Sequence, residues 1–359
     1  MNGNKKERFI GNSSLSVVDA MSLIDKNAKG ILFVVDENNK LIGSLTDGDI
    51  RRWLLNAGEL TATVDAVMNS NPKWLLESER KYAYDFMYEK RITAVPIVDI
   101  NRQIIDIFLV NDEKDVSETK SKANLSEVPV VVMAGGKGTR LYPYTKILPK
   151  PLIPIGETPI VERIINCFNE YGMGKFYMTV NYKKGMIRSY FNDLKPAYSI
   201  KYVEEDKPLG TGGSIKLITD KFERPLFVTN CDTLILADYA DIYNYHVKSG
   251  NKITVVSALK NIAIPYGVVH SGENGEIVEI EEKPKLSYFI NTGMYVINPE
   301  TIELIPNDVM FHMTHLVEKV MKNGGKVGTY PISEDSFLDM GELDEMKRME
   351  QKLNIISER

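Results

Sequence analysis

A segment rich in glycine and cations, between residues 134 and 156, constrains this chain more than any other stretch. It reads A-G-G-K-G-T-R-L-Y-P-Y-T-K-I-L-P-K-P-L-I-P-I-G and follows an apolar run, Val128 to Met133, that is typical of a buried parallel strand. Apolar residues at helical spacing follow in Pro159 to Glu170. Glycines after a strand let backbone N–H groups approach phosphate oxygens, because no Cβ stands between them. Arg140 and Lys150 add two cations, so the segment predicts a phosphate-binding loop.

Two common phosphate-binding motifs do not fit this segment. A Walker A loop needs four residues between its glycines and then Gly-Lys-Ser/Thr, and the dinucleotide fingerprint needs Gly-x-Gly-x-x-Gly. The segment instead resembles the signature of the sugar-1-phosphate nucleotidylyltransferases. That signature is Gly-Gly-x-Gly-Thr-Arg-Leu, a proline-rich spacer, and then Pro-Lys-Pro-Leu. A glycine-rich turn in an unrelated α/β protein is the alternative.

Length and charge narrow the class of protein. A chain of 359 residues is too long for one small core and suggests two domains. A net charge of −5 and a pI near 5.6 give no electrostatic footprint for nucleic acid or an anionic membrane. Two cysteines suggest no disulfide framework, and no run approaches the ~18 apolar residues that cross a bilayer. We therefore expect a cytoplasmic protein without nucleic-acid or membrane partners.

A charged stretch, residues 111–127, divides the chain. Eight of its seventeen residues are charged and none is aromatic. Such a stretch cannot bury enough apolar surface to offset its ordering entropy, so it is expected to connect two domains. The predicted boundaries are an N-terminal module at 1–120, a linker at 121–127 and a second domain at 128–359.

The N-terminal module contains a duplicated unit, with copies at about 8–60 and 61–115. Each copy reads helix, strand ending in Asp, polar turn, strand and acidic loop. The module resembles a tandem pair of CBS domains, an α+β family that commonly binds adenosine nucleotides. The resemblance assigns ligand contacts to Thr46 and Asp49; the second copy has Leu109 and Asp112 instead, so at most one competent site is expected. A dimerisation platform without ligand is the alternative, and the family resemblance leads us to expect a homo-oligomer.

Strand and helix patterns alternate after residue 128. This order predicts an α/β, Rossmann-like domain with a mixed, mostly parallel sheet and helices on both faces. Ligands of such sheets bind at the carboxyl ends of the strands. A hairpin is expected over Gly267 to Lys283, turning at Asn274-Gly275. The other expected strands are 175–181, 199–203, 225–229 and 252–258, and the expected helices are 185–191, 212–221 and 239–248.

The resemblance implies nucleotidyl transfer, in which a sugar-1-phosphate oxygen attacks the α-phosphate of a nucleoside triphosphate and pyrophosphate leaves. It assigns catalysis to Arg140, on the β/γ-phosphates, to Lys150, beside the α-phosphate and the sugar phosphate, and to Asp232. The resemblance also implies Mg²⁺ at Asp232 and Asp339, and carboxylates are the hard oxygen ligands that this ion prefers. For a single Asp at a strand end, a helix cap or turn is the alternative.

The remaining site residues also follow from the resemblance. The nucleotide is expected to contact Ala134, Gly135, Gly136, Gly138, Thr139, Glu205, Gly210 and Thr211. The sugar phosphate is expected at Tyr266, Gly267, Glu282, Lys283, Asn291 and Thr292.

The base is predicted from Glu205, which stands where relatives that use thymidine or uridine nucleotides often place Gln. A carboxylate only accepts hydrogen bonds, and guanine offers adjacent N1–H and N2–H₂ donors. This complementarity predicts GTP as the donor. The alternative is a Glu204 or Glu205 that is simply solvated within an acidic run.

The two-part chain looks most like the bacterial glucosamine-1-phosphate guanylyltransferases of the legionaminic acid pathway, which make GDP-glucosamine. The resemblance therefore implies GTP and a hexose-1-phosphate as substrates, with glucosamine-1-phosphate as the sugar. Mannose-1-phosphate or heptose-1-phosphate is an open alternative. An alternative of a different class is a catalytically silent regulatory subunit that senses nucleotides through its CBS pair.

Overall fold

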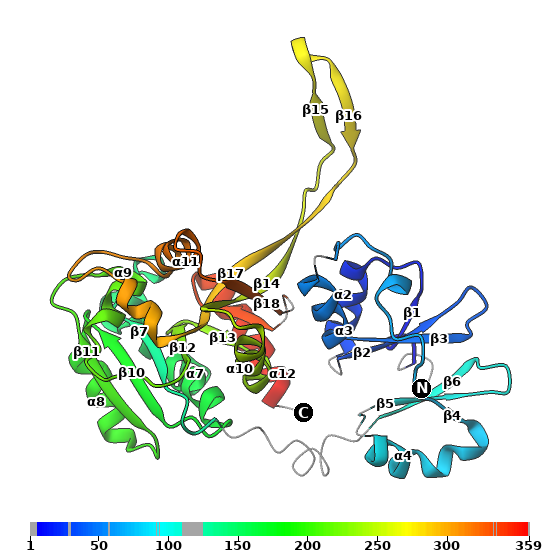
Figure 1. Ribbon diagram of the computed structural model, residues 1–359, viewed down its shortest axis with the longest axis horizontal. Helices are drawn as coiled ribbons and strands as arrows, with labels where there is room; N and C mark the ends of the chain where they lie inside the picture. The colour runs from blue at the N-terminus through cyan, green and yellow to red at the C-terminus, as the bar shows by residue number, and fades with distance from the viewer. Residues whose placement is uncertain are drawn as a thin grey trace. The chain divides into compact units, whose positions relative to one another are not determined.

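The computed structural model describes residues 6–27, 30–56, 58–90, 92, 94–109, 125–332, 334 and 336–357. The chain divides into two compact units, one of residues 1–120 and 260–288, the other of residues 121–259 and 289–359 (Figure 1). Asp112 and most of the expected linker lie outside the described residues. Leu125 is buried in the second unit, and its N–H donates to Tyr171 O at 2.9 Å. The described core of that unit therefore begins before residue 128.

The first unit contains two small three-stranded sheets of the same design. In each, a parallel pair is followed by an antiparallel partner, and a helix precedes the middle strand. The first sheet has β1 (Ile10–Asn12), β2 (Ile31–Val35) and β3 (Leu41–Thr46), with α2 (Val17–Asn27) and α3 (Asp47–Leu55). The second has β4 (Leu75–Leu76), β5 (Ala94–Val98) and β6 (Ile104–Leu109), with α4 (Ala83–Lys90) and short 3₁₀ turns at Val64–Ala66 and Glu77–Tyr82.

The two sheets repeat with an offset of 63 residues. Ile31 pairs with Thr46 in the first sheet, and Ala94 pairs with Leu109 in the second. Both ladders carry a bulge one residue before the strand ends, and both hairpin turns place a non-glycine residue, Asn39 or Arg102, at positive φ. The backbone bonds across the two turns also match. Equivalent backbone geometry at equivalent positions supports the internal duplication expected from the sequence.

A hairpin in the segment 260–288 places an apolar pair and a polar pair on opposite faces. It consists of β15 (Val268–Ser271), a 3₁₀ turn at Glu273–Gly275 and β16 (Ile277–Glu281), so the Asn-Gly turn forms where the sequence places it. Val269 pairs with Ile280 on one face, and His270 pairs with Glu279 on the other. The hairpin joins β14 (Ile253–Ala263) to β17 (Lys285–Ile297), two long strands whose other ends belong to the second unit.

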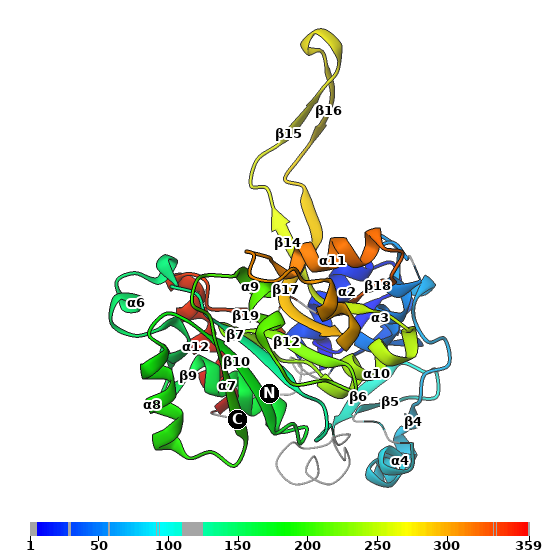
Figure 2. The same cartoon turned by 60° about the vertical axis from the view of Figure 1, so that its left-hand side comes forward.

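A seven-stranded sheet forms the centre of the second unit, in the order β11-β10-β7-β12-β17-β14-β18 (Figures 1 and 2). β10, β11 and β12 extend parallel to β7, whereas β17 is antiparallel to β12. The mixed, mostly parallel sheet predicted from the sequence is therefore confirmed. The remaining strands of this sheet are β7 (Val130–Ala134), β10 (Lys175–Val180), β11 (Ser199–Glu204), β12 (Leu226–Asn230) and β18 (Val327–Ile332).

The central strand β7 is buried on both faces, which explains its continuous apolar sequence. Val130, Val132 and Ala134 belong to a core that also contains residues of α7, α8 and α10. Val131 and Met133 belong to a second core shared with α11 and the short turns before it. The helices are α7 (Ile160–Asn169), α8 (Lys184–Leu194), α9 (Gly210–Gly213), α10 (Tyr239–Ser249), α11 (Met313–Lys322) and α12 (Leu343–Ser357), with 3₁₀ turns at Ser214–Leu217 and Pro299–Leu304.

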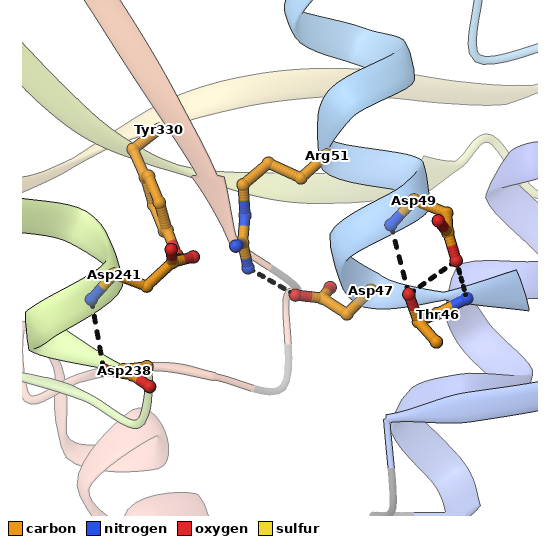
Figure 3. Close-up of polar contacts among 7 residues, drawn as sticks. All are labelled: Thr46, Asp47, Asp49, Arg51, Asp238, Asp241 and Tyr330. Atoms are coloured by element: carbon orange, nitrogen blue, oxygen red, sulfur yellow. Dashed lines mark hydrogen bonds and ion pairs between the residues drawn. The ribbon is translucent and has the colours of Figure 1, made fainter. Parts of the chain in front are cut away.

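Side-chain caps fix where some of these helices begin. Asp238 precedes α10, and its Oδ1 accepts from the N–H groups of Ala240 and Asp241 at 3.0 and 3.1 Å (Figure 3). Tyr330, on β18, donates to the Asp241 carboxylate at 2.7 Å. These bonds satisfy helix N-terminal donors and attach α10 to the edge strand of the sheet.

Helix α8 ends on Lys195, an exposed residue at φ 48°, whereas α10 ends on Gly250 at φ 63°. A side chain in this left-handed region costs about 1 kcal/mol relative to glycine. We expect Lys195→Gly to raise the free energy of unfolding by about 1 kcal/mol in thermal or urea unfolding of the full chain.

Gly250→Ala is the matched control, because a Cβ there would meet no atom within 4 Å and only the backbone angle is tested. It should lower stability by a similar amount. Equal stability of Lys195→Gly and the wild-type protein would contradict the strain assigned to Lys195.

Candidate active site

The glycine loop leaves the carboxyl end of β7 and turns at Gly138. Gly138 has φ 66°, and a Cβ there would lie 3.0 Å from both Lys150 Cβ and Thr145 Cγ2. The left-handed backbone and the close approach of Lys150 both favour glycine at this position. Leu141 N–H and the Thr145 hydroxyl donate to Gly138 O at 3.0 and 2.8 Å, which holds the turn closed.

Lys150 is buried and forms an ion pair with Asp232, whose side chain is also largely buried. Asp232 follows β12, and β12 lies beside β7 in the sheet. The chain continues from β7 to β10 and β11 on one side and returns to β12 on the other. This reversal of strand order is the position where open α/β sheets bind ligands. The predicted loop and the predicted strand-end acid therefore meet at one switch point.

A short two-stranded ladder, formed by β13 (Thr233–Ile235) and β19 (Phe337–Asp339), places Asp339 next to Asp232. Thr233 pairs with Asp339, and Met340 N–H donates to Asp232 O at 2.9 Å. Burial, and then the charge of Asp232, raise the pKa of Asp339 to about 6, against the opposing effects of Lys150 and Arg140. A Cβ on Gly341 would lie 2.9 Å from the Asp339 carboxylate and 3.5 Å from an Arg140 nitrogen. The structure thus brings Arg140, Lys150, Asp232 and Asp339 together.

Cys231 lies next to Asp232 and is buried. Burial, and secondarily the charge of Asp232, raise the pKa of its thiol to about 12. A thiol with this pKa stays protonated at neutral pH and is inert as a nucleophile. Cys231 is therefore a buried neighbour of Asp232 without a nucleophilic role.

Glu205 follows β11 and lies against the glycine loop. It is 6% exposed, its Oε2 accepts from Leu209 N–H at 3.1 Å, and a Cβ on Gly135 would lie 2.4 Å from Oε1. Burial raises the pKa of Glu205, while the Leu209 N–H and the Ser214 hydroxyl act in the opposite direction. Of the two neighbouring acids Glu204 and Glu205, only Glu204 lies at the surface, where it forms ion pairs with Lys184 and Arg188. The alternative of a solvated Glu205 is therefore wrong.

The turn at Gly210 and Thr211 is held by the segment that begins α11. Gly210 has φ 75°, and a Cβ there would lie 2.8 Å from Phe311 O, so only glycine fits. Gly212 and Gly213 donate N–H groups to Phe311 O, and the Thr211 hydroxyl accepts from Met313 N–H at 3.1 Å. The expected nucleotide turn is thus fixed between Glu205 and α11.

Asn291 and Thr292 lie on β17 beside β12. Asn291 donates to Tyr295 OH at 2.6 Å and accepts from Gly293 N–H at 3.0 Å. Thr292 is buried and donates to Val256 O at 2.8 Å, so its hydroxyl serves the sheet. A Cβ on Gly293 would lie 2.2 Å from Asn230 Nδ2. Asn230, at the end of β12 and two residues before Asp232, therefore packs closely against Gly293, and only glycine leaves room for its side chain.

The other four expected sugar-phosphate residues lie at the base of the β15–β16 hairpin. A Cβ on Gly267 would lie 3.1 Å from Glu282 Oε2, and Glu282 Oε1 lies 3.8 Å from Lys283 Nζ. Tyr266 is 75% exposed. These residues belong to the first unit, and their contact with a sugar phosphate stays a prediction.

Thr46 and Asp49, in the first unit, bind each other. The Thr46 hydroxyl donates to Asp49 Oδ2 at 2.6 Å, and the N–H of each residue donates to the side chain of the other (Figure 3). This reciprocal arrangement is a capping box at the start of α3. It gives both side chains a structural role in helix initiation, and their expected contact with an adenosine nucleotide stays a prediction.

Asp232 and Asp339 could bind a divalent cation whose remaining ligands come from the substrate phosphates and water. Within the described ranges, no cluster of three or more His, Cys, Asp and Glu side chains could hold a metal ion. Asp232 immediately precedes β13, and Asp339 ends β19, the strand that pairs with β13, and the charge of Asp232 contributes to the raised pKa of Asp339. A divalent cation would relieve this repulsion, and Mg²⁺ commonly uses one or two carboxylates together with phosphate oxygens and water.

Comparison with known proteins identifies the family. Residues 129–354 match the nucleotidyl transferase family, and residues 12–56 match the CBS domain. The first match covers the glycine loop, Lys150, Asp232 and Asp339 and more than half of the chain. The chain belongs to the nucleotidyl transferase family.

Several curated proteins are similar to this family member. A UTP–glucose-1-phosphate uridylyltransferase of Synechocystis is 34% identical over 196 residues, 49% of this chain and 50% of that protein. A mannose-1-phosphate guanyltransferase of Debaryomyces hansenii is 33% identical over 184 residues, 49% of this chain and 51% of that protein. The chain thus spans about half the length of the curated relatives it matches.

A solved structure shares the fold. It is a Bacillus anthracis protein assigned as a glucose-1-phosphate thymidylyltransferase and crystallised with sucrose. It covers 63% of this chain and 94% of its own at a TM-score of 0.51, with 22% identity. In the part of the chain that the structure describes, no helix is both long enough and apolar enough to span a membrane.

The environment of Asp339 predicts how stability depends on pH. Its folded pKa of about 6 lies above the ordinary value of 3.8, so the folded state binds the proton more tightly. The contribution of protonated Asp339 to the free energy of unfolding is therefore fully present below about pH 4 and is lost as the pH rises through about 6. Without divalent metal, Asp339→Asn should therefore stabilise the protein, by about 1 kcal/mol more at pH 7.5 than at pH 5.

The measurement is urea unfolding of both proteins at the two pH values in the presence of a chelator. Asp344→Asn, on the first turn of α12, is the control for loss of an acidic side chain. A gain from Asp339→Asn that is equal at both pH values would contradict the assigned pKa.

Proposed function

We propose that this protein transfers a nucleotidyl group from a nucleoside triphosphate to a hexose-1-phosphate, giving an NDP-sugar and pyrophosphate. The observation that carries the proposal is the convergence of two cations and two carboxylates at the switch point of the sheet. The names of the curated relatives, which act on glucose-1-phosphate or mannose-1-phosphate, support a sugar phosphate as acceptor.

The proposed reaction forms one bond at phosphorus and breaks another. An oxygen of the sugar phosphate attacks the α-phosphorus, and the bond to the leaving pyrophosphate oxygen breaks. Arg140 is proposed to bind the β/γ-phosphates and Lys150 to bind the α-phosphate and the incoming phosphate, so that two repelling anions are held in line. Asp232 and Asp339 are proposed to hold Mg²⁺, which when bound neutralises developing charge on the phosphates.

Substrate phosphate also changes the partners of Lys150. Its ammonium group is paired with Asp232 in the structure, and both groups are largely buried. In the proposed reaction Mg²⁺ would bind the Asp232 carboxylate, and the ammonium group of Lys150, held in place by its buried stem, would bind the α-phosphate. Such charged donors, fixed before reaction, contribute several kcal/mol to barrier lowering in other enzymes.

GTP is the proposed donor. The support is a buried carboxylate at Glu205, adjacent to Gly135 of the glycine loop, with one oxygen already bound to Leu209 N–H. A buried acceptor discriminates strongly, because a base without matching donors leaves its charge unpaired. Among the relatives, the name of the Debaryomyces guanyltransferase supports a guanine nucleotide, whereas the Synechocystis protein is named for UTP.

Glucosamine-1-phosphate is the proposed acceptor, from the resemblance to guanylyltransferases that also carry a CBS pair. Mannose-1-phosphate and heptose-1-phosphate are the alternative acceptors. The N-terminal module at 1–120 is proposed as a tandem CBS pair, joined through 121–127 to the catalytic domain at 128–359. It is proposed to bind an adenosine nucleotide and to support a homo-oligomer.

A catalytically silent regulatory subunit is the rival of a different class. Such a subunit has no need for an ion pair buried beside a second carboxylate, since unneeded buried charges are costly. The intact set of Arg140, Lys150, Asp232 and Asp339 therefore favours the enzyme.

The test is pyrophosphate release by the full chain with Mg²⁺, across four nucleoside triphosphates and a panel of hexose-1-phosphates. We expect release with GTP and glucosamine-1-phosphate, and a loss of at least about 100-fold in Lys150→Met and Asp232→Asn. Release with another base would overturn the GTP assignment alone. Folded protein that is inactive with every pair would overturn the enzyme.

Replacing the buried carboxylate tests the base assignment directly. Glu205→Gln should lower the preference for GTP over UTP by about 10-fold or more, because the amide presents a donor to guanine N–H groups. Glu204→Gln, at the exposed neighbour, should leave the preference unchanged. The assignment falls if kcat/KM ratios for GTP and UTP are the same in Glu205→Gln and in the wild-type enzyme.

A further inference from the structure

A single helical turn, α6 (Tyr144–Ile147), connects the two cations of the proposed phosphate site. Arg140 lies in the 3₁₀ turn before it (Thr139–Leu141), and Lys150 begins the 3₁₀ turn after it (Lys150–Leu152). Thr145 is its buried residue, whereas Tyr144 and Ile147 are 50% and 73% exposed. One turn of helix is not stable by itself in water, so other groups must fix its path.

Two consecutive side chains bind the carbonyl groups of this turn. Tyr182 OH donates to Thr145 O at 3.1 Å. Lys183 Nζ donates to Lys146 O at 2.6 Å and to Ile147 O at 2.7 Å. The last carbonyls of a helix have no partner within the helix, and here three successive ones are satisfied from the connection between β10 and α8. Figure 2 shows α6 and α8 along the same edge of the second unit.

The backbone of Lys183 supports a specific role for this residue. It stands at the N-cap of α8 with φ 51°, in the left-handed region that disfavours a side chain with a Cβ. Ser, Thr, Asn, Asp or Gly would be the ordinary residue at an N-cap. Its side chain makes no capping bond to α8, and its ammonium group is instead directed at α6. Strained backbone of this kind persists where surrounding contacts require it and is concentrated at functional sites.

The contacts continue from α6 to the glycine loop. The Thr145 hydroxyl donates to Gly138 O at 2.8 Å, and Gly138 packs against Lys150 Cβ and Thr145 Cγ2. A displacement of α6 would therefore move the turn that carries Arg140 relative to Lys150. Lys150 itself is fixed by burial and by Asp232, whereas Arg140 is on the exposed side of the loop.

We propose that Lys183, assisted by Tyr182, is a positioning residue that fixes the spacing of Arg140 and Lys150 by binding the carbonyls of α6. The proposal rests on the proposed nucleotidyl transfer, in which both cations bind one triphosphate. A small misplacement of such groups has large kinetic effects, because catalysis here depends on alignment. Lys183 acts through α6 and does not itself touch substrate.

The test compares three variants of the full chain in the pyrophosphate assay. Lys183→Met keeps the stem and removes the donors, and it should lower kcat for NDP-sugar formation by about 10- to 100-fold with little change in the melting temperature. Lys183→Arg, which can donate to two carbonyls, should recover most of the rate. Lys184→Met, at the neighbour paired with Glu204, should behave as wild type.

Backbone hydrogen exchange of residues 142–149 is the second measurement, and it does not depend on activity. Exchange in this segment should increase in Lys183→Met and not in Lys184→Met. An inactive wild type with this increase would overturn the proposed function and support the positioning contact. An active wild type with unchanged kcat in Lys183→Met, or unchanged exchange in the segment, would overturn the role of Lys183.

Discussion

The buried ion pair of Lys150 and Asp232 is the interaction on which the rest of the site depends. Two charges with this little exposure are stable together and costly apart, because each has lost most of its hydration. Asp339 lies beside the pair, and burial, followed by the charge of Asp232, raises its pKa. Gly138 follows from the same constraint, since the Lys150 stem occupies the space that a Cβ would need. The charges of Lys150 and Asp232 therefore cancel, whereas Asp339, within the described part of the chain, has no full partner charge and favours a cation.

The architecture explains how distant segments supply this balance. Parallel strands β7 and β12 deliver the glycine loop and Asp232 to the same edge, while the short β13–β19 ladder returns Asp339 to Asp232. Glu205 and the Gly210 turn approach from the other side of β7, after β11. Each contribution comes from a connection between elements, and the buried sheet fixes where those connections begin.

Much of this was predictable because the signals are local. Five apolar residues in β7, the glycine loop after it and an Asp after β12 lie within short windows, and the mostly parallel character of the sheet follows from strand and helix alternation. Burial of Glu205 was not predictable, because its acidic neighbours suggest solvent and only the fold separates it from Glu204. The capping box of Thr46 and Asp49 is similarly ambiguous, since the same residue types cap helices and bind ligands. Lys183 gave no signal, because its left-handed backbone and its distant carbonyl partners exist only in the folded chain.

The ladder that carries Asp339 has a consequence for biosynthesis. The ribosome makes the glycine loop, Lys150 and Asp232 well before it makes β19, yet the second acid arrives only when β19 pairs with β13. Both partners of the Lys150–Asp232 ion pair therefore lie in the part of the chain that is made before β19, whereas the second carboxylate does not. A chain that stops before β19 would contain the glycine loop and Asp232 but lack Asp339, so the site is complete only after β19 has been made.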